Sequence, residues 1–409
     1  MRYLLRMGLR NIWKNRRRSA ATMLAVAIGF AAINLFAGYV DNVYTGLREQ
    51  AIHSERLGHL MIVKRGMFLE GSIDPGKYLF SGAELKRITQ LLRQENEVAL
   101  ATPRLDVNGI VSNGKVSTIF ISEGLVPRDL AAIRGDYSMG RGGSLDPGNP
   151  IGAALAQDLA ALLRLNTGDG AVVLTTTAEG MTNALDIEVA DVFNTGISGT
   201  NDKFILLPLE LAQRLFDTDG ADRLVVLLKD VAATETMRER LAAVLAKAGF
   251  EVEIKTWREL SVFYGQVKAL FDMIFLFISA IVIVVVIMSI INTMSMAVVE
   301  RTREIGTLRA LGMKQKGVAR LFVLEGLTLA LAGCVLGVAL TVAVAAIINN
   351  LGITYVPPNS SHHVPLLVDL NATAFALTFL VMAVLAGLSA FLPARAAARR
   401  GIVAALGHA

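Results

Sequence analysis

The sequence has 409 residues, of which 53% are hydrophobic and only 18% are charged, and its mean hydropathy is +0.51. A chain of this length could form two or three soluble domains, but this composition indicates that much of it lies in lipid and argues against a wholly soluble enzyme. The single cysteine, Cys334, cannot form an internal disulfide. The formal net charge of +5 has a meaning only once the charges are assigned to segments of the chain.

Four runs with almost no charge are long enough to cross the roughly 30 Å hydrocarbon core of a membrane. The first run is longer than the apolar core of a signal peptide and no small-x-small site closes it, so an uncleaved anchor is expected. Four spans place both termini on one side of the membrane. The predicted spans are 19–40, 273–299, 321–348 and 372–392, with 41–272 and the loop 349–371 on the other side.

The distribution of basic residues predicts which side is which, because short loops rich in Lys and Arg stay in the cytoplasm. Segment 1–18 has seven basic and no acidic residues, and loop 300–320 has six basic against two acidic. The tail, 393–409, adds three arginines. Both termini are therefore predicted to be cytoplasmic and the large domain periplasmic, in a multi-pass protein of the bacterial inner membrane. Because the basic residues cluster at membrane edges, no nucleic-acid partner is expected.

The basic residues of segment 1–18 also have a helical spacing. Arg2, Arg6, Arg10 and Lys14 recur every fourth residue, with apolar residues on another face. This pattern predicts a helix lying in the cytoplasmic interface, and a merely solvated basic face is the alternative.

Residues 41–272 are predicted to form a large domain on a helical stalk. Apolar residues recur at three- and four-residue steps in 41–50 and 257–272, next to the first and second spans, and predict the two helices of the stalk. The predicted fold is thus a membrane protein of four transmembrane α-helices with a large α+β periplasmic domain between helices 1 and 2.

Two subdomains are expected within this domain. Two β-α-β patterns, in 57–104 and 223–256, are expected to form one of them, and 105–222 is expected to be a β-rich insert. The insert is predicted to contain one helix, 151–163. It begins with two strand patterns joined at Asn113-Gly114, a pair typical of a type I′ hairpin turn.

The sequence shows no motif of a catalytic site. It has no G-x-x-x-x-G-K-[ST] loop to hold nucleotide phosphates and no G-x-S-x-G, H-E-x-x-H or C-x-x-C motif, so the chain is expected to be no enzyme. His362 and His363 are neighbours, but adjacent residues of an extended loop point apart, which favours a solvated loop over a metal site.

A segment that is both charged and apolar follows the second span. Apolar residues at every third position predict a short amphipathic helix with acid–base pairs on its polar side, and Gly312 is expected to end it in the left-handed conformation. The alternative is a solvated connector, but a connector this apolar would leave its stripe in water. The predicted stripe is Ile305, Leu308 and Leu311, and the predicted pairs are Glu300 with Arg303 and Arg301 with Glu304.

Several motifs carry a resemblance to a known family. They are ERTREIGTLRALGM from residue 300, INTMSMAVV before it, LPARAAARR near the end and LRNIWKNRRRS near the start. Together these resemble the FtsX/MacB-like permeases, or type VII ABC transporters, over the whole chain. GHLMIVKRG at 58–66, DVNGIVSNG at 106–114 and TWREL at 256–260 look most like the LolC/LolE lipoprotein-releasing group.

This resemblance implies partners. A separate ATPase of the LolD/MacB type would bind ATP and Mg and dock on helix 301–312, while this chain would bind no cofactor. A second permease subunit, identical or homologous, and a periplasmic lipoprotein carrier or adaptor are also implied. MacB carries its nucleotide-binding domain on the same chain, so a fused pump is not expected here, but a split one stays open. The residues assigned to ATPase coupling are Glu300, Arg301, Thr302, Arg303, Glu304, Ile305, Gly306, Leu308, Arg309, Leu311 and Gly312.

The function expected from the resemblance is ATP-driven release of acylated proteins from the membrane. Extracting acyl chains costs on the order of 0.8 kcal/mol per CH₂, which calls for a motor. The alternatives are efflux through a tripartite MacB-like assembly and FtsX-like signalling to an envelope hydrolase. Gly333 and Gly337 form a G-x-x-x-G pattern expected to pack helices closely. The predicted acyl contacts, for which lipid-facing or packing roles are the alternative, are Phe30, Ile33, Phe36, Met273, Phe275 and Phe277.

Overall fold

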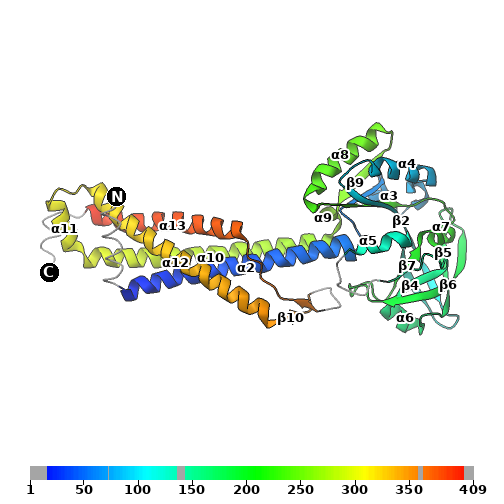
Figure 1. Ribbon diagram of the computed structural model, residues 1–409, viewed down its shortest axis with the longest axis horizontal. Coiled ribbons are helices and arrows are strands. Elements are labelled where there is room, and N and C mark those ends of the chain that lie inside the picture. The colour runs from blue at the N-terminus through cyan, green and yellow to red at the C-terminus, as the bar shows by residue number, and fades with distance from the viewer. Residues whose placement is uncertain (1–15, 72, 136–142, 358–362, 400–409) are drawn as a thin grey trace. The chain divides into compact units, whose positions relative to one another are not determined.

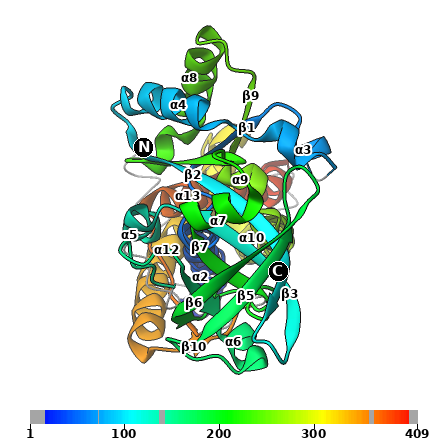
Figure 2. The same cartoon turned by 90° about the vertical axis from the view of Figure 1, so that its right-hand side faces the viewer.

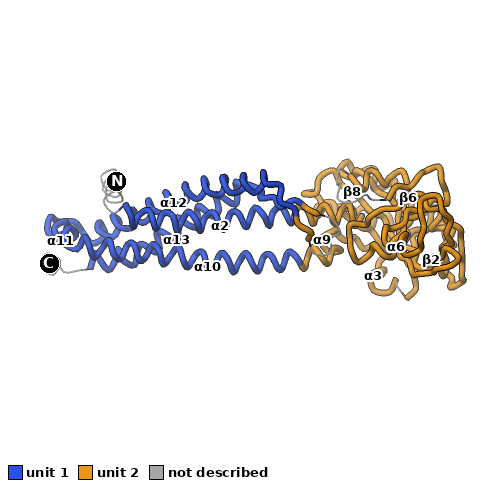
Figure 3. The backbone as a smooth tube through the Cα atoms, turned by 90° about the horizontal axis from the view of Figure 1, so that it is seen from below, with its two compact units in different colours: residues 1–44, 267–354, 365–409 blue, residues 45–266, 355–364 orange. Residues whose placement is uncertain are grey.

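The computed structural model describes residues 16–71, 73–135, 143–357 and 363–399. The chain divides into two compact units (Figure 3). Unit 1 comprises residues 1–44, 267–354 and 365–409, and unit 2 comprises residues 45–266 and 355–364. The predicted interface helix, 1–18, lies outside the described residues except for its last three positions.

Four long helices form unit 1 and are long and apolar enough to cross a membrane, as predicted (Figure 1). They exceed the predicted spans because polar residues at their ends continue the helical hydrogen bonding. The last helix even passes through Pro393, which was expected to follow the fourth span. Their bounds are Arg16–Glu49 (α2), Val262–Glu300 (α10), Gln315–Leu351 (α12) and Ala372–Arg399 (α13); α11 (Thr302–Ala310) lies between α10 and α12, and β10 (Thr354–Tyr355) and β11 (Val364–Pro365) between α12 and α13.

The core of unit 1 lies where these helices meet. Phe30 of α2, Ile290 of α10, Leu329 of α12 and Ala386 of α13 are buried in one cluster. A second cluster joins α11 to the ends of α10, α12 and α13, and it includes Ala394, Ala397 and Ala398. Packing of these alanines explains why α13 continues beyond its proline.

Unit 2 is built on a nine-stranded sheet, and its strands face the viewer in Figure 2. The strand order is β3-β7-β4-β6-β5-β2-β8-β1-β9, and β3 also pairs with β2. This extra pairing closes the first six strands of the order into a ring. The bounds are Leu60–Lys64 (β1), Val98–Ser112 (β2), Ser117–Leu125 (β3), Gly152–Ala156 (β4), Gly170–Thr176 (β5), Thr182–Phe193 (β6), Phe204–Pro208 (β7), Arg223–Leu228 (β8) and Val252–Thr256 (β9).

Strand β2 belongs to both parts of this sheet. Its first half pairs with β8 from Val98 to Arg104, and its second half pairs with β3 from Arg104 to Ser112 and with β5 from Gly109 onward. The predicted boundary between the subdomains, 104/105, therefore falls inside one continuous strand of 15 residues.

Helices cover each part of the sheet. Leu85, Ile88 and Leu92 of α4 and Leu241 and Leu245 of α8 pack on the open sheet in one core. A separate core fills the ring and includes side chains from α6 and α7. The helices of unit 2 are Gln50–Ser54 (η1), Met67–Glu70 (α3), Pro75–Tyr78 (η2), Gly82–Arg93 (α4), Pro127–Asp129 (η3), Leu130–Arg134 (α5), Gln157–Leu163 (α6), Leu209–Phe216 (α7), Val231–Ala233 (η4), Thr234–Lys247 (α8) and Trp257–Leu260 (α9).

Two local predictions for the ring are wrong. The first half of the predicted helix 151–163 is strand β4, whose residues are all buried between β6 and β7, so pairing with these neighbours outweighs the helix propensity of its alanines. The hairpin between β2 and β3 is not a two-residue type I′ turn. Ser112 pairs with Ser117, and of Asn113 and Gly114 only the glycine has a positive φ, +85°.

A buried histidine lies at the start of β1. His59 is 5% exposed, and its Nδ1 accepts a hydrogen bond of 3.2 Å from the backbone N–H of Leu228, which requires a neutral ring. Burial, helped by the charges of His53 and Arg48, lowers the pKa of His59 to about 4. Protonation of His59 at Nδ1 would place its N–H against the backbone N–H of Leu228, so that two donors would face each other.

We expect acidification to destabilise unit 2 through His59. Because the folded-state pKa is depressed, the contribution is complete above the unfolded value of 6.5 and is lost as pH falls toward 4. Between pH 7.5 and 5.0 this loss amounts to about 2 kcal/mol. Urea unfolding followed by Trp257 fluorescence in a Trp13→Phe background measures it. His59→Gln keeps an acceptor without the charge, so equal pH dependence of the two proteins would contradict the assignment.

Candidate functional site

Helix α11 connects α10 to α12 at one end of unit 1. Gly312 has φ +96°, as predicted, and its N–H donates to the carbonyl of Arg309 while the N–H of Met313 donates to the carbonyl of Leu308, both at 3.0 Å. This pair of hydrogen bonds is the Schellman arrangement that ends a helix. The segment that resembles the coupling helix is therefore a short, sharply ended helix.

The predicted apolar stripe of α11 does not form one surface. Ile305 is buried in the cluster that α11 shares with Val298, Phe322 and the end of α13. Leu308 is half-buried, and Leu311 is 80% exposed because it follows the last turn. One side of α11 is thus held by its own chain through Thr302, Ile305 and Gly306, and the other presents Arg303, Glu304, Thr307, Ala310 and Leu311.

Arg301 fixes this helix to its neighbours. The predicted pair with Glu304 is present, with Nε 2.9 Å from Oε2, and Nη1 lies 3.0 Å from Oε2 of Glu325 on α12. The guanidinium also lies over the ring of Phe322, 5.5 Å from its centroid. Glu325 is only 5% exposed. An ion pair between two such positions requires a defined distance between α10, α11 and α12.

Helices α2 and α10 are joined by polar contacts at both ends within unit 1. At the end near α11, Arg18 Nη2 lies 2.9 Å from Glu300 Oε1. Toward the other end, the Tyr44 hydroxyl donates to Asp272 Oδ1 at 2.8 Å. Between these contacts, the hydroxyl groups of Thr22 and Thr293 lie 2.5 Å apart in the interior. Such contacts hold the two helices in one axial register.

The six predicted acyl contacts do not share a surface. Phe30 and Ile33 are buried in the core of unit 1, so their prediction as acyl contacts is wrong for this conformation. Phe36 stacks on Phe275 with ring centroids 6.1 Å apart. Met273 and Phe277 of α10 are exposed. The helical face on which a residue lies depends on the neighbouring helices, which a hydropathy pattern does not identify.

Gly333 and Gly337 lie where α12 contacts α2 of the same chain. A Cβ atom on Gly333 would lie 2.7 Å from the Val26 Cβ, and one on Gly337 would lie 2.8 Å from the Phe30 Cβ. Both distances are shorter than van der Waals contact. Any larger residue would therefore separate the two helices.

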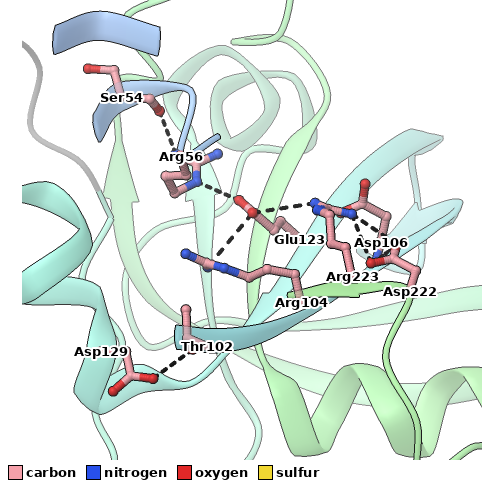
Figure 4. Close-up of polar contacts among 9 residues, drawn as sticks. All are labelled: Ser54, Arg56, Thr102, Arg104, Asp106, Glu123, Asp129, Asp222 and Arg223. Carbon is pink, nitrogen blue, oxygen red and sulfur yellow. Dashed lines mark hydrogen bonds and ion pairs between the residues drawn. The ribbon is translucent and has the colours of Figure 1, made fainter. Parts of the chain in front are cut away.

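A charged cluster lies where the ring of unit 2 meets its open sheet (Figure 4). Three arginines surround Glu123 of β3. Their guanidinium nitrogens lie 2.5 Å (Arg56), 3.5 Å (Arg223) and 3.7 Å (Arg104) from its carboxylate oxygens. Burial alone would raise the pKa of Glu123, but the three guanidinium groups together lower it to about 2.

Two aspartates complete the cluster on the side of Arg223. Arg223 Nη2 lies 2.6 Å from Asp106 Oδ1, and its Nη1 lies 2.9 Å from Asp222 Oδ2. Burial raises the pKa of Asp222 to about 7 against the effect of Arg223, and the neighbouring carboxylates of Asp106 and Glu123 add to the rise. Three arginines and three carboxylates thus balance in formal charge at the β2 crossing.

No pattern in the sequence predicts this cluster or the Arg18–Glu300 contact. Arg104 and Glu123 lie in strand patterns like any solvated charge, and only the shared path of β2 brings them together. Among the described residues no group of three or more His, Cys, Asp and Glu could hold a metal ion. His362, one of the two histidines considered for a metal, lies outside those residues.

Comparison with known proteins identifies the family. A model of the MacB-like periplasmic core domain matches residues 19–244, and a model of the FtsX-like permease C-terminal region matches residues 276–402. The chain belongs to the FtsX/MacB-like permeases, the type VII permeases of ABC transporters.

Two relatives and one solved structure show how similar the chain is to individual proteins. The chain is 26% identical over 406 residues to the macrolide export ATP-binding/permease protein MacB of Chromobacterium violaceum, covering 96% of this chain and 58% of the relative. It thus spans less than two thirds of the length of that protein. It is 35% identical over 74 residues to the ABC transporter permease YtrF of Bacillus subtilis, which is 18% of this chain and 17% of YtrF. The periplasmic region of MacB from Actinobacillus actinomycetemcomitans matches 49% of this chain and 90% of that structure, with 12% identity and a TM-score of 0.35.

Breaking the Arg301–Glu325 pair from one side should destabilise unit 1. Arg301→Met leaves the Glu325 carboxylate buried beside an apolar side chain, and we expect a loss of about 3–5 kcal/mol. The double variant with Glu325→Met should recover most of it. The lone thiol, buried at Cys334, supplies the measurement, since its reaction with a maleimide dye on heating reports opening of the helices. Equal stability of Arg301→Met and the double variant would contradict the pairing.

Arg104 and Glu123 should contribute differently to the stability of unit 2. Among the described residues, no hydrogen-bond partner reaches Nε, Nη1 or Nη2 of Arg104, which is fully buried. We therefore expect Arg104→Met to change the free energy of unfolding of unit 2 by less than about 1 kcal/mol, whereas Glu123→Gln should cost about 3 kcal/mol or more. Urea unfolding at pH 7 gives both values. A larger loss of unfolding free energy for Arg104→Met than for Glu123→Gln would contradict this prediction.

Proposed function

We propose that the chain is the permease subunit of an ABC transporter in which a separate cytoplasmic ATPase of the LolD/MacB type acts on α11. The observation that carries the proposal is the division of α11 into a side held by its own chain and a side that presents Leu311 and the charged residues before it. The exposed side combines this leucine, which is 80% exposed, with the charged Arg303 and Glu304, a mixture of apolar and charged groups that suits contact with another protein. ATP and Mg would be bound by the ATPase.

Force applied to α11 would reach the other helices through polar contacts between side chains. Arg301 connects α11 with Glu325 of α12, and Glu300 of α10 connects with Arg18 of α2. The helices α2 and α10 each continue from unit 1 into unit 2. A change in α11 would therefore be passed along continuous helices to the sheet-rich unit, without a channel for the client between the spans.

The membrane topology follows from the charge pattern. The basic segments at both termini and in loop 300–320 support a cytoplasmic location for α11 and the termini, with unit 2 in the periplasm and the helices in the inner membrane. A second permease subunit would complete the transporter. A periplasmic lipoprotein carrier or an adaptor would receive the client.

The client is proposed to be an acylated protein that the complex releases from the inner membrane. Exposed Met273, Leu276 and Phe277 of α10 supply apolar surface for acyl chains, whereas Phe30 and Ile33 do not. Efflux by a split MacB-type pump is the second candidate, and it is supported by the similarity to the macrolide export protein along 96% of this chain. The molecule that co-purifies with the complex from a membrane extract decides between them.

Leu311→Asp should abolish association with the ATPase and leave the fold intact. The leucine is 80% exposed, so an aspartate there disturbs a partner surface and not the core. Co-purification of the tagged permease with its ATPase measures the effect. Gln315→Asp places the same charge at an exposed position beyond Gly312 and should retain the ATPase. Undiminished recovery of the ATPase with Leu311→Asp would remove the docking role of α11.

A further inference from the structure

Unit 2 contains a cavity of about 850 Å³ beside the crossing of β2. This volume lies within the range of ligand sites. On β1, Leu60 and Ile62 face the helical core, whereas Met61 and Val63 face the cavity. Further apolar walls come from Met67, Phe68, Leu174 and Leu260. The cavity therefore lies on the side of β1 that faces away from α4 and α8.

The floor of the cavity, defined as Asp106, Asp222 and Arg223, holds all the charged residues of its lining. Both carboxylates contact the one guanidinium group, at 2.6 Å for Asp106 and 2.9 Å for Asp222. Acidic groups thus outnumber basic groups in the lining, and the side chain of Asp106 is 46% exposed. A ligand cation would find a carboxylate there, and a ligand anion would find Arg223 already surrounded by carboxylates.

The segment that walls the cavity also has apolar residues outside it. Met67 and Phe68 line the cavity, whereas Leu69 and Ile73, which we call the lip, are 86% and 85% exposed. The ammonium group of Lys255 lies 3.8 Å from the centroid of the Phe68 ring, so the cation–π position on this ring is already occupied. The apolar surface therefore extends beyond the volume that a small molecule would fill.

We propose that the cavity and the lip bind an apolar segment of another polypeptide, with a Lys or Arg side chain of that segment reaching Asp106 on the floor. A segment with apolar residues on both sides of a basic one would cover the lip, fill the cavity and supply the cation in a single binding mode. A small amphiphilic cation would leave Leu69 and Ile73 in water. The methionines of the wall, Met61 and Met67, are side chains that adapt to different apolar partners.

This inference rests on the proposed function in one respect. If unit 2 lies outside the cytoplasm, the polypeptide that carries this apolar and basic segment is an extracytoplasmic protein. The binding chemistry itself depends only on the described residues of unit 2, so it can be tested apart from ATPase docking.

The test uses the full chain in lipid nanodiscs and three fluorescent eight-residue peptides. Each consists of Leu and Ser around one central Lys, Gln or Glu, and empty nanodiscs correct for partition into lipid. The Lys peptide should bind about tenfold more tightly than the Glu peptide, with the Gln peptide between them, which corresponds to about 1.4 kcal/mol. Equal affinities for the three peptides would overturn the proposal.

Two sets of variants separate the floor from the lip. Asp106→Asn should reduce the affinity for the Lys peptide to that for the Gln peptide, and Asp186→Asn, at an exposed position outside the cavity lining, should leave the order unchanged. The double variant Leu69→Ser/Ile73→Ser should weaken the binding of all three peptides by a similar factor. The contrary result has two parts: the lip variant binds all three peptides like the wild type, and a naphthylmethylammonium probe binds the wild type but not Asp106→Asn. In that case the cavity binds small cations and the polypeptide assignment is wrong.

Failure of this proposal can be told apart from failure of the proposed function. Leu311→Asp should lose the ATPase and keep the peptide order, because the two surfaces use different residues. A chain that recruits the ATPase but shows no order among the peptides would overturn only the cavity assignment. A chain with the peptide order and no ATPase would overturn only the transporter assignment.

Discussion

The buried ion pair between Arg301 and Glu325 determines how the rest of unit 1 can move. Both groups have left water, so they are stable only together, and separating them would leave a buried charge without its counterion. Apolar helix contacts are different, because they lose little when one helix slides by a fraction of a residue. The pair therefore fixes the start of α11 against α12, and Gly333 and Gly337, further along α12, hold α2 close. A displacement of α11 cannot be absorbed locally.

In unit 2 a single strand plays the corresponding role. Because β2 pairs first with β8 and then with β3 and β5, the open sheet and the closed ring cannot rotate about a flexible linker. The charges of Arg56, Arg104 and Arg223 gather around Glu123 at this crossing, where the backbone leaves one sheet partner and takes up another. The cavity lies beside the same crossing, so a ligand on its floor contacts residues of both parts.

The sequence predicts features set by local composition and misses those set by tertiary packing. The four membrane helices, the left-handed Gly312 and the Arg301–Glu304 pair follow from hydropathy, glycine chemistry and helical spacing, and the structure has them. Strand β4 was predicted as helix because its alanines favour helix, whereas its neighbours supply the strand pairing. Phe30 was expected to face acyl chains because hydropathy does not tell a lipid-facing residue from one facing another helix. The partner of Glu325 could not be predicted from local spacing either, since Arg301 lies 24 residues away.

The polar contacts between α2 and α10 determine how a displacement of one helix would act on the other. The Arg18–Glu300, Thr22–Thr293 and Tyr44–Asp272 contacts lie along the interface of α2 and α10 and are directional, so each fits one axial register. Apolar side chains between them supply attraction over many registers. A pair of helices joined only by apolar contacts would take up a push by sliding. With polar contacts at both ends, the same push would move both helices together, and under the proposed function the work done on α11 would then reach the residues that continue into unit 2.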